Sequence, residues 1–364
     1  GEFLGVNGRM TRTTTKTQRS AHREAQIKSK TEGKRLLSDA VMRPLMAAHM
    51  AYTSKVTARL GGRPRIAWVT SGAPVELLRA VGVTPQYPEN YGALVSAWGK
   101  AQPLLEAAEA NGYAEDLCSY ARIHIGSLLA PQAAPLGGLP KPDLLVGANN
   151  ICATVTKWWE ALAELLEVPL FWLDTPFREG LGGGAGRHRL TYVEAQLREL
   201  GRWLEGCGAA PLEESRLRKV LTLSRSALEL WRLCLETCRA SPSPMNSADR
   251  FVYMSHIVKL RGTVSAVAFY AFLLAETRSR RWRGQGAVPG ERHRLLWDNI
   301  AVWPATFKLP KIFAELGCSF PVDTYTSAWS GAFSPAEGLS GVARVYADIF
   351  LNLDVEAKVQ RMVE

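Results

Sequence analysis

Residues 140–177 read PKPDLLVGANNICATVTKWWEALAELLEVPLFWLDTPF. The apolar run at 143–148 is typical of a buried strand, and the spacing of the apolar residues at 154–166 predicts a helix. A second apolar run at 168–173 predicts another strand, so strand, helix and strand follow one another within about 35 residues, the length of a βαβ unit. The sequence therefore predicts an α/β fold with a mostly parallel sheet flanked by helices, similar to flavodoxin and Rossmann folds.

Two cysteines lie where one local pattern gives way to another. Cys152 follows the first predicted strand, at the carboxyl-end edge where open α/β sheets bind ligands. Cys118 precedes another helical pattern in YAEDLCSYARIHIGS, residues 113–127. They lie 34 positions apart, too far for a local metal-binding pair, but a βαβ fold can bring such residues together. Taken singly, each is more often a buried thiol than a metal ligand.

The chain length predicts two lobes, because 364 residues exceed the size at which one hydrophobic core usually keeps growing. Ser-Pro-Ser-Pro at 241–244 breaks a helical pattern and marks the expected boundary. We expect residues 1–35 to be a tag and a basic flexible arm, and helical spacing at 36–60 predicts an N-terminal helical arm. Residues 36–240 form the predicted N-terminal α/β lobe, which contains both cysteines. Residues 241–364 form a C-terminal α/β lobe that we expect to be incomplete at its end.

The composition is that of an ordinary globular protein, with 47% hydrophobic residues and a mean hydropathy of -0.07. No run of 18 or more apolar residues occurs, and no apolar core follows the basic residues near the start, so neither a membrane span nor a secretory signal is predicted. The six cysteines form no dense framework, which indicates a reducing compartment. We therefore expect a cytoplasmic protein with no membrane partner.

The net charge of +10 is concentrated at the start of the chain. Of the 44 Lys and Arg and the 34 Asp and Glu, residues 1–65 hold 14 and 4, which leaves 30 of each in the remainder. A nucleic-acid-binding tail is one interpretation of this arm, but the arm lacks interleaved aromatic residues and a recognisable fold. An arm that is solvated or docks on a partner subunit is the stronger interpretation, so nucleic acid is not an expected partner.

A second candidate site lies at residues 66–90. A strand at 66–70 opens into Ser71-Gly72-Ala73, and Pro74 begins a helix at 75–80, so free backbone N–H groups make the turn a natural anion or carbonyl site. Ser71 is either the cap of that helix or a functional hydroxyl. The next strand is predicted to end at Pro88, with Glu89 just beyond it. Glu89 is either a solvated turn carboxylate or a general acid/base whose pKa rises in a closed pocket.

Several short segments of the chain carry a resemblance to a known family. They are CSYAR at 118–122, PKPDLL at 140–145, NNIC at 149–152, KW at 157–158 and DTPF at 174–177. In these segments the chain resembles the iron–sulfur subunits of the 2-hydroxyacyl-CoA dehydratase and benzoyl-CoA reductase superfamily. The similarity extends from about residue 65 to the end of the chain, so it covers most of the molecule.

The resemblance implies roles for individual residues. Ser71 and Glu89 match positions that the family associates with the substrate hydroxyl and its proton. Cys118 and Cys152 match thiolate ligands of a [4Fe–4S] cluster, the ligand type that such clusters prefer. The flanking residues Tyr120, Asn149 and Asn150 are expected to donate hydrogen bonds to cluster sulfur or to substrate.

The family supplies three cysteines per cluster, and the third ligand is not identified in this chain. Either the matching C-terminal segment is expected beyond Glu364, or the chain departs from its relatives at this ligand. Cys318 is the only cysteine after residue 241 and is a weak candidate, because it lies where a helix end, a glycine and a strand start are predicted, which favours a structural role.

The resemblance also implies an activity and partners. The chain is expected to be one subunit of a heterodimer of related subunits, which receives single electrons from an ATP-dependent iron–sulfur activator and reduces an acyl-CoA thioester to a ketyl radical anion. In a dehydratase this expels the hydroxyl of a 2-hydroxyacyl-CoA, whereas in a benzoyl-CoA reductase the electron stays in the ring. The presence of both Ser71 and Glu89 favours the dehydratase. A benzoyl-CoA reductase subunit and a non-catalytic scaffold subunit remain the alternatives.

Three further patterns are interpreted as structural or left open. The glycine-rich run at 180–187 does not follow a dinucleotide-binding register and is predicted to be a loop. Cys234 and Cys238 have the spacing of a chelating pair, but packing inside a helical core is the stronger interpretation. Arg261 is equally suited to CoA phosphates and to pairing with a carboxylate.

Overall fold

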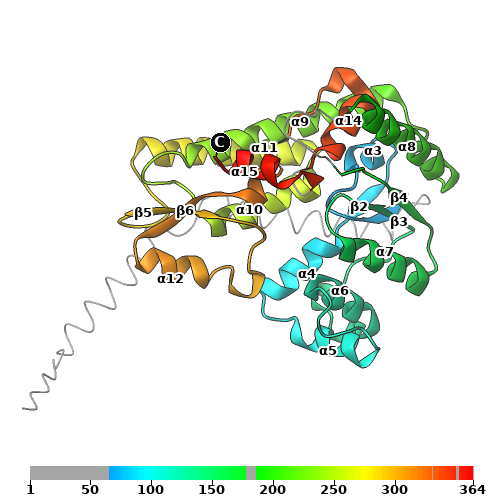
Figure 1. The fold of residues 1–364 in the computed structure, drawn as a ribbon, viewed down its shortest axis with the longest axis horizontal. Coiled ribbons are helices and arrows are strands. Elements are labelled where there is room, and N and C mark those ends of the chain that lie inside the picture. The colour runs from blue at the N-terminus through cyan, green and yellow to red at the C-terminus, as the bar shows by residue number, and fades with distance from the viewer. Residues whose placement is uncertain (1–64, 178–185, 330, 350–351, 364) are drawn as a thin grey trace, which may run out of the picture.

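The computed structural model describes residues 65–177, 186–329, 331–349 and 352–363 (Figure 1). The predicted basic arm, the helix at 36–60 and most of the glycine-rich run lie outside these residues. Within them, no helix is both long and apolar enough to cross a bilayer.

The predicted parallel sheet is confirmed. Four strands pair in parallel in the order β2–β1–β3–β4. Their bounds are β1 Ile66–Val69, β2 Thr84–Gln86, β3 Leu144–Ala148 and β4 Leu170–Leu173. In the register, Trp68 lies opposite Gln86 on one side and opposite Leu145 on the other. Every residue of β1 and β3 is buried, as expected for parallel strands that are covered on both faces.

Helices cover the two faces of this sheet. Alternate residues of β1 separate the faces: Ala67 and Val69 belong to one cluster of buried apolar side chains, and Ile66 and Trp68 belong to another. The first cluster is completed by α3 Val75–Ala80, α8 Arg187–Gly206 and α9 Glu214–Thr237, and the second by α6 Ser119–Leu129 and α7 Ala153–Leu166. The predicted strand–helix–strand unit at 143–173 is therefore β3–α7–β4, and the α/β class is confirmed.

Two expectations about residues 83–111 are wrong in detail. The strand ends at Gln86, before the predicted end at Pro88, because Pro88 occupies the first turn of α4 Pro88–Ala97, where proline fits without losing a hydrogen bond. The sequence pattern at 91–111 predicts one helix, but the chain forms two helices here, α4 and α5 Gln102–Ala110. Gly99 separates them with a φ of +66°, a conformation that glycine adopts without strain. Glu89 consequently lies in the first turn of a helix.

The second half of the chain is mainly helical and contains a small second sheet. Its helices are α10 Ser247–Leu260, α11 Val264–Trp282, α12 Leu309–Glu315, α13 Thr324–Ser327, α14 Gly338–Ala347 and α15 Val355–Val363. Strands β5 His293–Trp297 and β6 Cys318–Asp323 pair in parallel. Short 3-10 turns lie at η1 Pro131–Ala133, η2 Pro135–Gly137, η3 Trp303–Ala305 and η4 Pro335–Glu337. The sequence pattern predicts a helical stretch at 251–280 with an interruption at 259–263, and a strand that starts near residue 293. Both are confirmed, by the turn between α10 and α11 and by β5.

The two sheets lie on opposite sides of the molecule, with α4 and α10 between them (Figure 1). The larger apolar cluster contains residues from β1 and α3 and also from α10, α11 and α14, so its side chains come from both sides of residue 241. The division into two lobes at residues 240 and 241 therefore stays a prediction.

A buried ionic network joins four segments behind the Ser71 turn. Glu76 of α3 accepts hydrogen bonds from Arg261 Nε at 2.9 Å and from Ser224 Oγ at 2.8 Å. Tyr346 of α14 donates to Glu76 and accepts from Arg261 Nη2 at 2.7 Å. Arg261 is therefore paired with a carboxylate, and the alternative of a CoA phosphate contact does not apply to its guanidinium.

Candidate functional site

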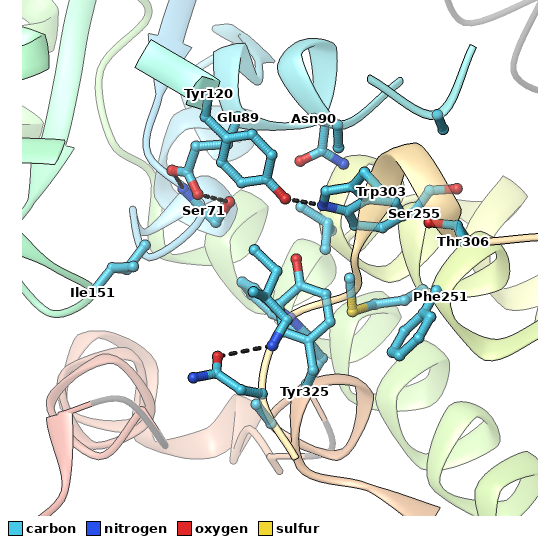
Figure 2. Close-up of a pocket in the computed structure, with 18 of the residues that line it drawn as sticks. Ser71, Glu89, Asn90, Tyr120, Ile151, Phe251, Ser255, Trp303, Thr306 and Tyr325 are labelled. Atoms are coloured by element: carbon cyan, nitrogen blue, oxygen red, sulfur yellow. Dashed lines mark hydrogen bonds between the residues drawn. The ribbon is translucent and has the colours of Figure 1, made fainter. Parts of the chain in front are cut away.

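A cavity of about 1260 Å³ lies between the two halves of the chain. It is bordered by α4, the N-terminal ends of α6 and α7, and by α10, η3 and α13 from the second half (Figure 2). Five of the predicted site residues line it: Ser71, Glu89, Cys118, Tyr120 and Cys152. Asn149, Asn150 and Cys318 do not. The structure thus gathers side chains that lie up to 81 positions apart in the sequence.

Ser71 and Glu89 form a pair at the edge of the cavity. The backbone N–H of Ser71 donates to Glu89 Oε1 at 2.8 Å, and Ser71 Oγ donates to Glu89 Oε2 at 2.8 Å. Both bonds are drawn in Figure 2. Ser71 does not cap α3, whose N-terminal end has no side-chain cap. The hydroxyl is instead held against a carboxylate, so the capping interpretation is wrong.

Glu89 is suited to hold a proton. Burial raises the pKa of Glu89, and the two hydrogen bonds from Ser71 lower it by less, so the net pKa lies above that of an ordinary glutamic acid. A carboxyl group whose pKa moves toward neutral pH transfers protons more effectively at working pH. Glu89 is half-buried in the cavity wall and is not the solvated turn carboxylate that was the alternative.

Both cysteines occupy the same position in their helices. Cys118 precedes the first residue of α6 and Cys152 precedes the first residue of α7. Burial raises the pKa of Cys152, hydrogen bonds from the backbone N–H groups of Val155 and Thr154 lower it, and the negative charges of Glu89 and Cys118 raise it further. Each thiol thus lies at a helix N-terminus, and the net pKa of Cys152 lies above that of an ordinary thiol because burial outweighs its backbone hydrogen bonds.

Both thiols are free cysteines that are available as metal ligands. Both side chains are exposed to the cavity and neither forms a disulfide. Iron–sulfur clusters are held by such thiolates. Among the described residues, no group of three or more His, Cys, Asp or Glu side chains is placed to hold a metal ion. No third such side chain in the described part of the chain is grouped with Cys118 and Cys152.

Tyr120 extends from α6 to the second half of the chain. Its hydroxyl accepts a hydrogen bond from the indole N–H of Trp303 in η3 (Figure 2). Burial raises the pKa of Tyr120, and the charges of Tyr325, Glu89 and Cys118 raise it further. The phenol is therefore neutral and lies among the groups of the candidate site.

Asn149 and Asn150 hold the backbone around the site. Asn150 is buried, and its Nδ2 donates to the carbonyl oxygens of Gly72 and Tyr346 at 3.2 and 3.1 Å. Asn149 Oδ1 accepts from the backbone N–H and the hydroxyl of Thr175 at 2.7 and 2.8 Å. These bonds occupy Asn150 Nδ2 and Asn149 Oδ1, whereas the buried Oδ1 of Asn150 has no partner among the described residues. A direct bond to cluster or substrate stays a prediction.

The remaining cysteines lie away from the cavity. Cys318 begins β6 after Gly317, whose φ of +72° ends the preceding helical turn, and it does not line the cavity. Cys234 and Cys238 are buried in the larger apolar cluster, and Cys234 Sγ donates to the carbonyl oxygen of Tyr270 at 3.7 Å. The packing interpretation of this pair is confirmed.

Sequence reasoning missed the residues that the second half contributes. Tyr325 of α13 and Lys259 of α10 both line the cavity. Burial raises the pKa of Tyr325, with further contributions from Glu89 and Asp323, and burial lowers the pKa of Lys259 to about 8. The position of Tyr325 at the carboxyl end of β6 is a signal that could have identified it. No pattern around Lys259 in the sequence points to a site.

Comparisons with known proteins bear on the same residues. A family model described as "2-hydroxyglutaryl-CoA dehydratase, D-component" matches residues 70–363. The chain is 31% identical over 315 residues to the (R)-2-hydroxyisocaproyl-CoA dehydratase alpha subunit of Clostridioides difficile, covering 86% of this chain and 76% of that protein.

More distant relatives match as well. The (R)-phenyllactyl-CoA dehydratase alpha subunit of Clostridium sporogenes is 30% identical over 267 residues, covering 73% of this chain and 65% of that protein. One of the subunits of the benzoyl-CoA reductase of Thauera aromatica is 26% identical over 261 residues, covering 69% of this chain and 60% of that protein. The matched region is therefore shorter than each of these relatives.

Proposed function

The chain belongs to the 2-hydroxyglutaryl-CoA dehydratase D-component family, and from this membership we propose that it is a catalytic subunit that removes water from a 2-hydroxyacyl-CoA. One observation carries the proposal: the Ser71–Glu89 pair shares a cavity with two cysteines at helix N-termini. The named dehydratase subunits among its relatives support the same activity.

The chemistry of this elimination requires controlled proton transfer. The hydroxyl leaves C2 and a proton leaves C3, and together they form water. In our proposal, protonated Glu89 donates its proton to the departing hydroxyl, and the resulting carboxylate accepts the proton from C3. The raised pKa of Glu89 favours the protonated form at the start of this sequence. Ser71 holds Glu89 in place through its hydroxyl. In our proposal this hydroxyl also contacts the substrate hydroxyl.

Cys118 and Cys152 are the residues that would hold the cluster. When bound, a [4Fe–4S] cluster supplies single electrons at a low potential, which no amino-acid side chain can store. The relatives are named as alpha subunits, which supports a homologous second subunit as partner. The ATP-dependent iron–sulfur activator remains part of the proposal on the family resemblance alone.

The apolar lining of the cavity favours a substrate whose acyl group carries an apolar side chain. Its walls are rich in aromatic side chains, among them Trp98, Trp158, Phe251, Trp303, Phe307 and Trp329. Apolar walls favour burial of a branched aliphatic or aromatic group. The same walls suit the ring of benzoyl-CoA, and the benzoyl-CoA reductase relative supports that second candidate. A scaffold subunit is the third candidate, because only two thiols are grouped in the described residues.

Turnover of defined substrates tests the proposal. The chain is co-purified without oxygen with its partner subunit and mixed with activator, ATP and a reductant. We expect 2-hydroxyacyl-CoA to yield 2-enoyl-CoA, and Glu89→Gln to lower kcat about 100-fold or more, the usual loss for a general acid/base. Glu106→Gln on α5 changes a solvent-exposed carboxyl group and is the matched control. Reduction of benzoyl-CoA without conversion of any 2-hydroxyacyl-CoA would contradict the proposal.

A further inference from the structure

The second half of the chain contributes a phenol to the centre of the cavity. Tyr325 lies where the chain turns from β6 into α13, and Figure 2 shows its side chain pointing into the cavity from the side opposite Ser71 and Glu89. The charge of Glu89 contributes to the raised pKa of Tyr325, so the two side chains lie within electrostatic range of each other.

The hydroxyl of Tyr325 lacks a hydrogen-bond partner in the part of the chain that the structure describes. Three other tyrosines have one: Tyr270 donates to the carbonyl oxygen of Tyr253 at 2.8 Å, Tyr91 donates to that of Pro135 at 3.0 Å, and Tyr120 accepts from Trp303. Tyr325 is half-buried, and its hydroxyl is not among the buried polar atoms that lack a partner. A ligand in the cavity can therefore accept a hydrogen bond from this hydroxyl without displacing a protein partner.

The protonation states of the neighbouring groups decide what Tyr325 can bind. Burial, Glu89 and Asp323 all raise its pKa, so its O–H remains a neutral donor. Ser71 directs its hydroxyl proton at Glu89. A substrate oxygen that lies beside this pair therefore meets a free donor on the opposite side of the cavity, and that donor is Tyr325.

We propose that Tyr325 is a substrate-binding residue whose phenol O–H donates a hydrogen bond to the oxygen of the substrate's 2-hydroxyl group. This inference rests on the proposed function, because it places a 2-hydroxyacyl-CoA in the cavity with its hydroxyl beside Glu89. The departing oxygen then lies between a proton donor from the first half of the chain and a hydrogen-bond donor from the second half. The site consequently selects acyl-CoA esters that carry an oxygen at C2.

Binding measurements with two ligands test the inference without turnover. The intact complex, purified without oxygen and without activator, is titrated with a 2-hydroxyacyl-CoA and with the acyl-CoA of the same chain that lacks the hydroxyl. One hydrogen bond corresponds to about a 2- to 10-fold change in Kd. We expect Tyr325→Phe to weaken binding of the hydroxylated ligand by that factor and to leave Kd of the deoxy ligand within about 2-fold.

The ratio of the two Kd values is the decisive quantity, because a smaller folded fraction of the variant affects both ligands equally. Tyr192→Phe is the matched control: it removes an exposed phenol that bonds Asp174 at 2.8 Å, and we expect it to leave the ratio unchanged. A Tyr325→Phe complex with the wild-type ratio would overturn the inference and leave the proposed function standing. If the wild-type complex binds neither ligand, the proposed function fails and the inference fails with it.

Discussion

His124 should make the protein sensitive to acid. Its imidazole is fully buried on α6, with ring centroids 4.6 Å from Trp68 and 5.6 Å from Trp158, and neither ring nitrogen has a hydrogen-bond partner among the described residues. Burial lowers the pKa of His124 to about 3. Charging the ring inside this aromatic shell is costly, so the folded protein keeps it neutral.

The size of the effect follows from proton linkage. The unfolded chain binds a proton at His124 below a pKa of about 6.5, whereas the folded chain binds it only near 3. The stability that the neutral ring contributes is fully present above pH 6.5 and is lost as the pH falls from 6.5 to 3. Because of this difference between the two pKa values, the free energy of unfolding at pH 5 is about 2 kcal/mol lower than at pH 7.5.

Substitution isolates this contribution from other titrating groups. His124→Leu replaces the unpaired nitrogens with apolar atoms of similar volume. Between pH 7.5 and pH 5 we expect the free energy of unfolding of this variant to fall by about 2 kcal/mol less than that of wild type. Urea unfolding followed by tryptophan fluorescence at both pH values measures the difference. His188→Gln, which changes an exposed histidine, should behave like wild type. Equal acid sensitivity of wild type and His124→Leu would refute the reasoning.

Three further outcomes are expected. Glu76→Gln leaves the buried Arg261 without its carboxylate and should lower the free energy of unfolding by about 3–5 kcal/mol, measured by urea denaturation; a loss under 1 kcal/mol would contradict this. Lys259 has no ion pair in the described residues, so Lys259→Met should weaken acyl-CoA binding, and wild-type affinity should fall as the pH rises through about 8 while the variant's stays level; parallel pH profiles would contradict this. Gly126→Ala places a Cβ against the carbonyl of Leu104 and should destabilise the α5–α6 contact by roughly 1–3 kcal/mol, measured by thermal unfolding; an unchanged Tm would refute the close approach.

Local patterns predicted the first half of the molecule well because its signals are local. The unit β3–α7–β4 combines short apolar runs with a helix of clear periodicity, and each cysteine lies at a boundary between such patterns. The meeting of Ser71 with Glu89 followed from the family resemblance. The break between α4 and α5 was missed, because a single glycine is tolerated in a helical pattern and the positive φ of Gly99 is not visible in a sequence.

The contributions of the second half depend on contacts that no local pattern encodes. Tyr325 reaches the cavity because β6 and α13 place it there, and it is 236 positions from Glu89 in the sequence. The pairing of Arg261 with Glu76 likewise joins residues 185 positions apart. Asn150 Nδ2 likewise holds the backbone of Gly72, 78 positions away. In each case tertiary packing decides the role.

Iron and acid-labile sulfide content, with an EPR spectrum after reduction, tests the central claim most directly. The protein is purified without oxygen together with its partner, as wild type and as Cys118→Ala, Cys152→Ala and Cys207→Ala variants; Cys207 does not line the cavity and serves as the control. In wild type and control we expect about four irons and four sulfides bound per copy of this chain. In the Cys118→Ala and Cys152→Ala variants we expect this iron and sulfide to be lost. A Cys118→Ala or Cys152→Ala protein that keeps its full iron, sulfide and EPR signal would contradict the account.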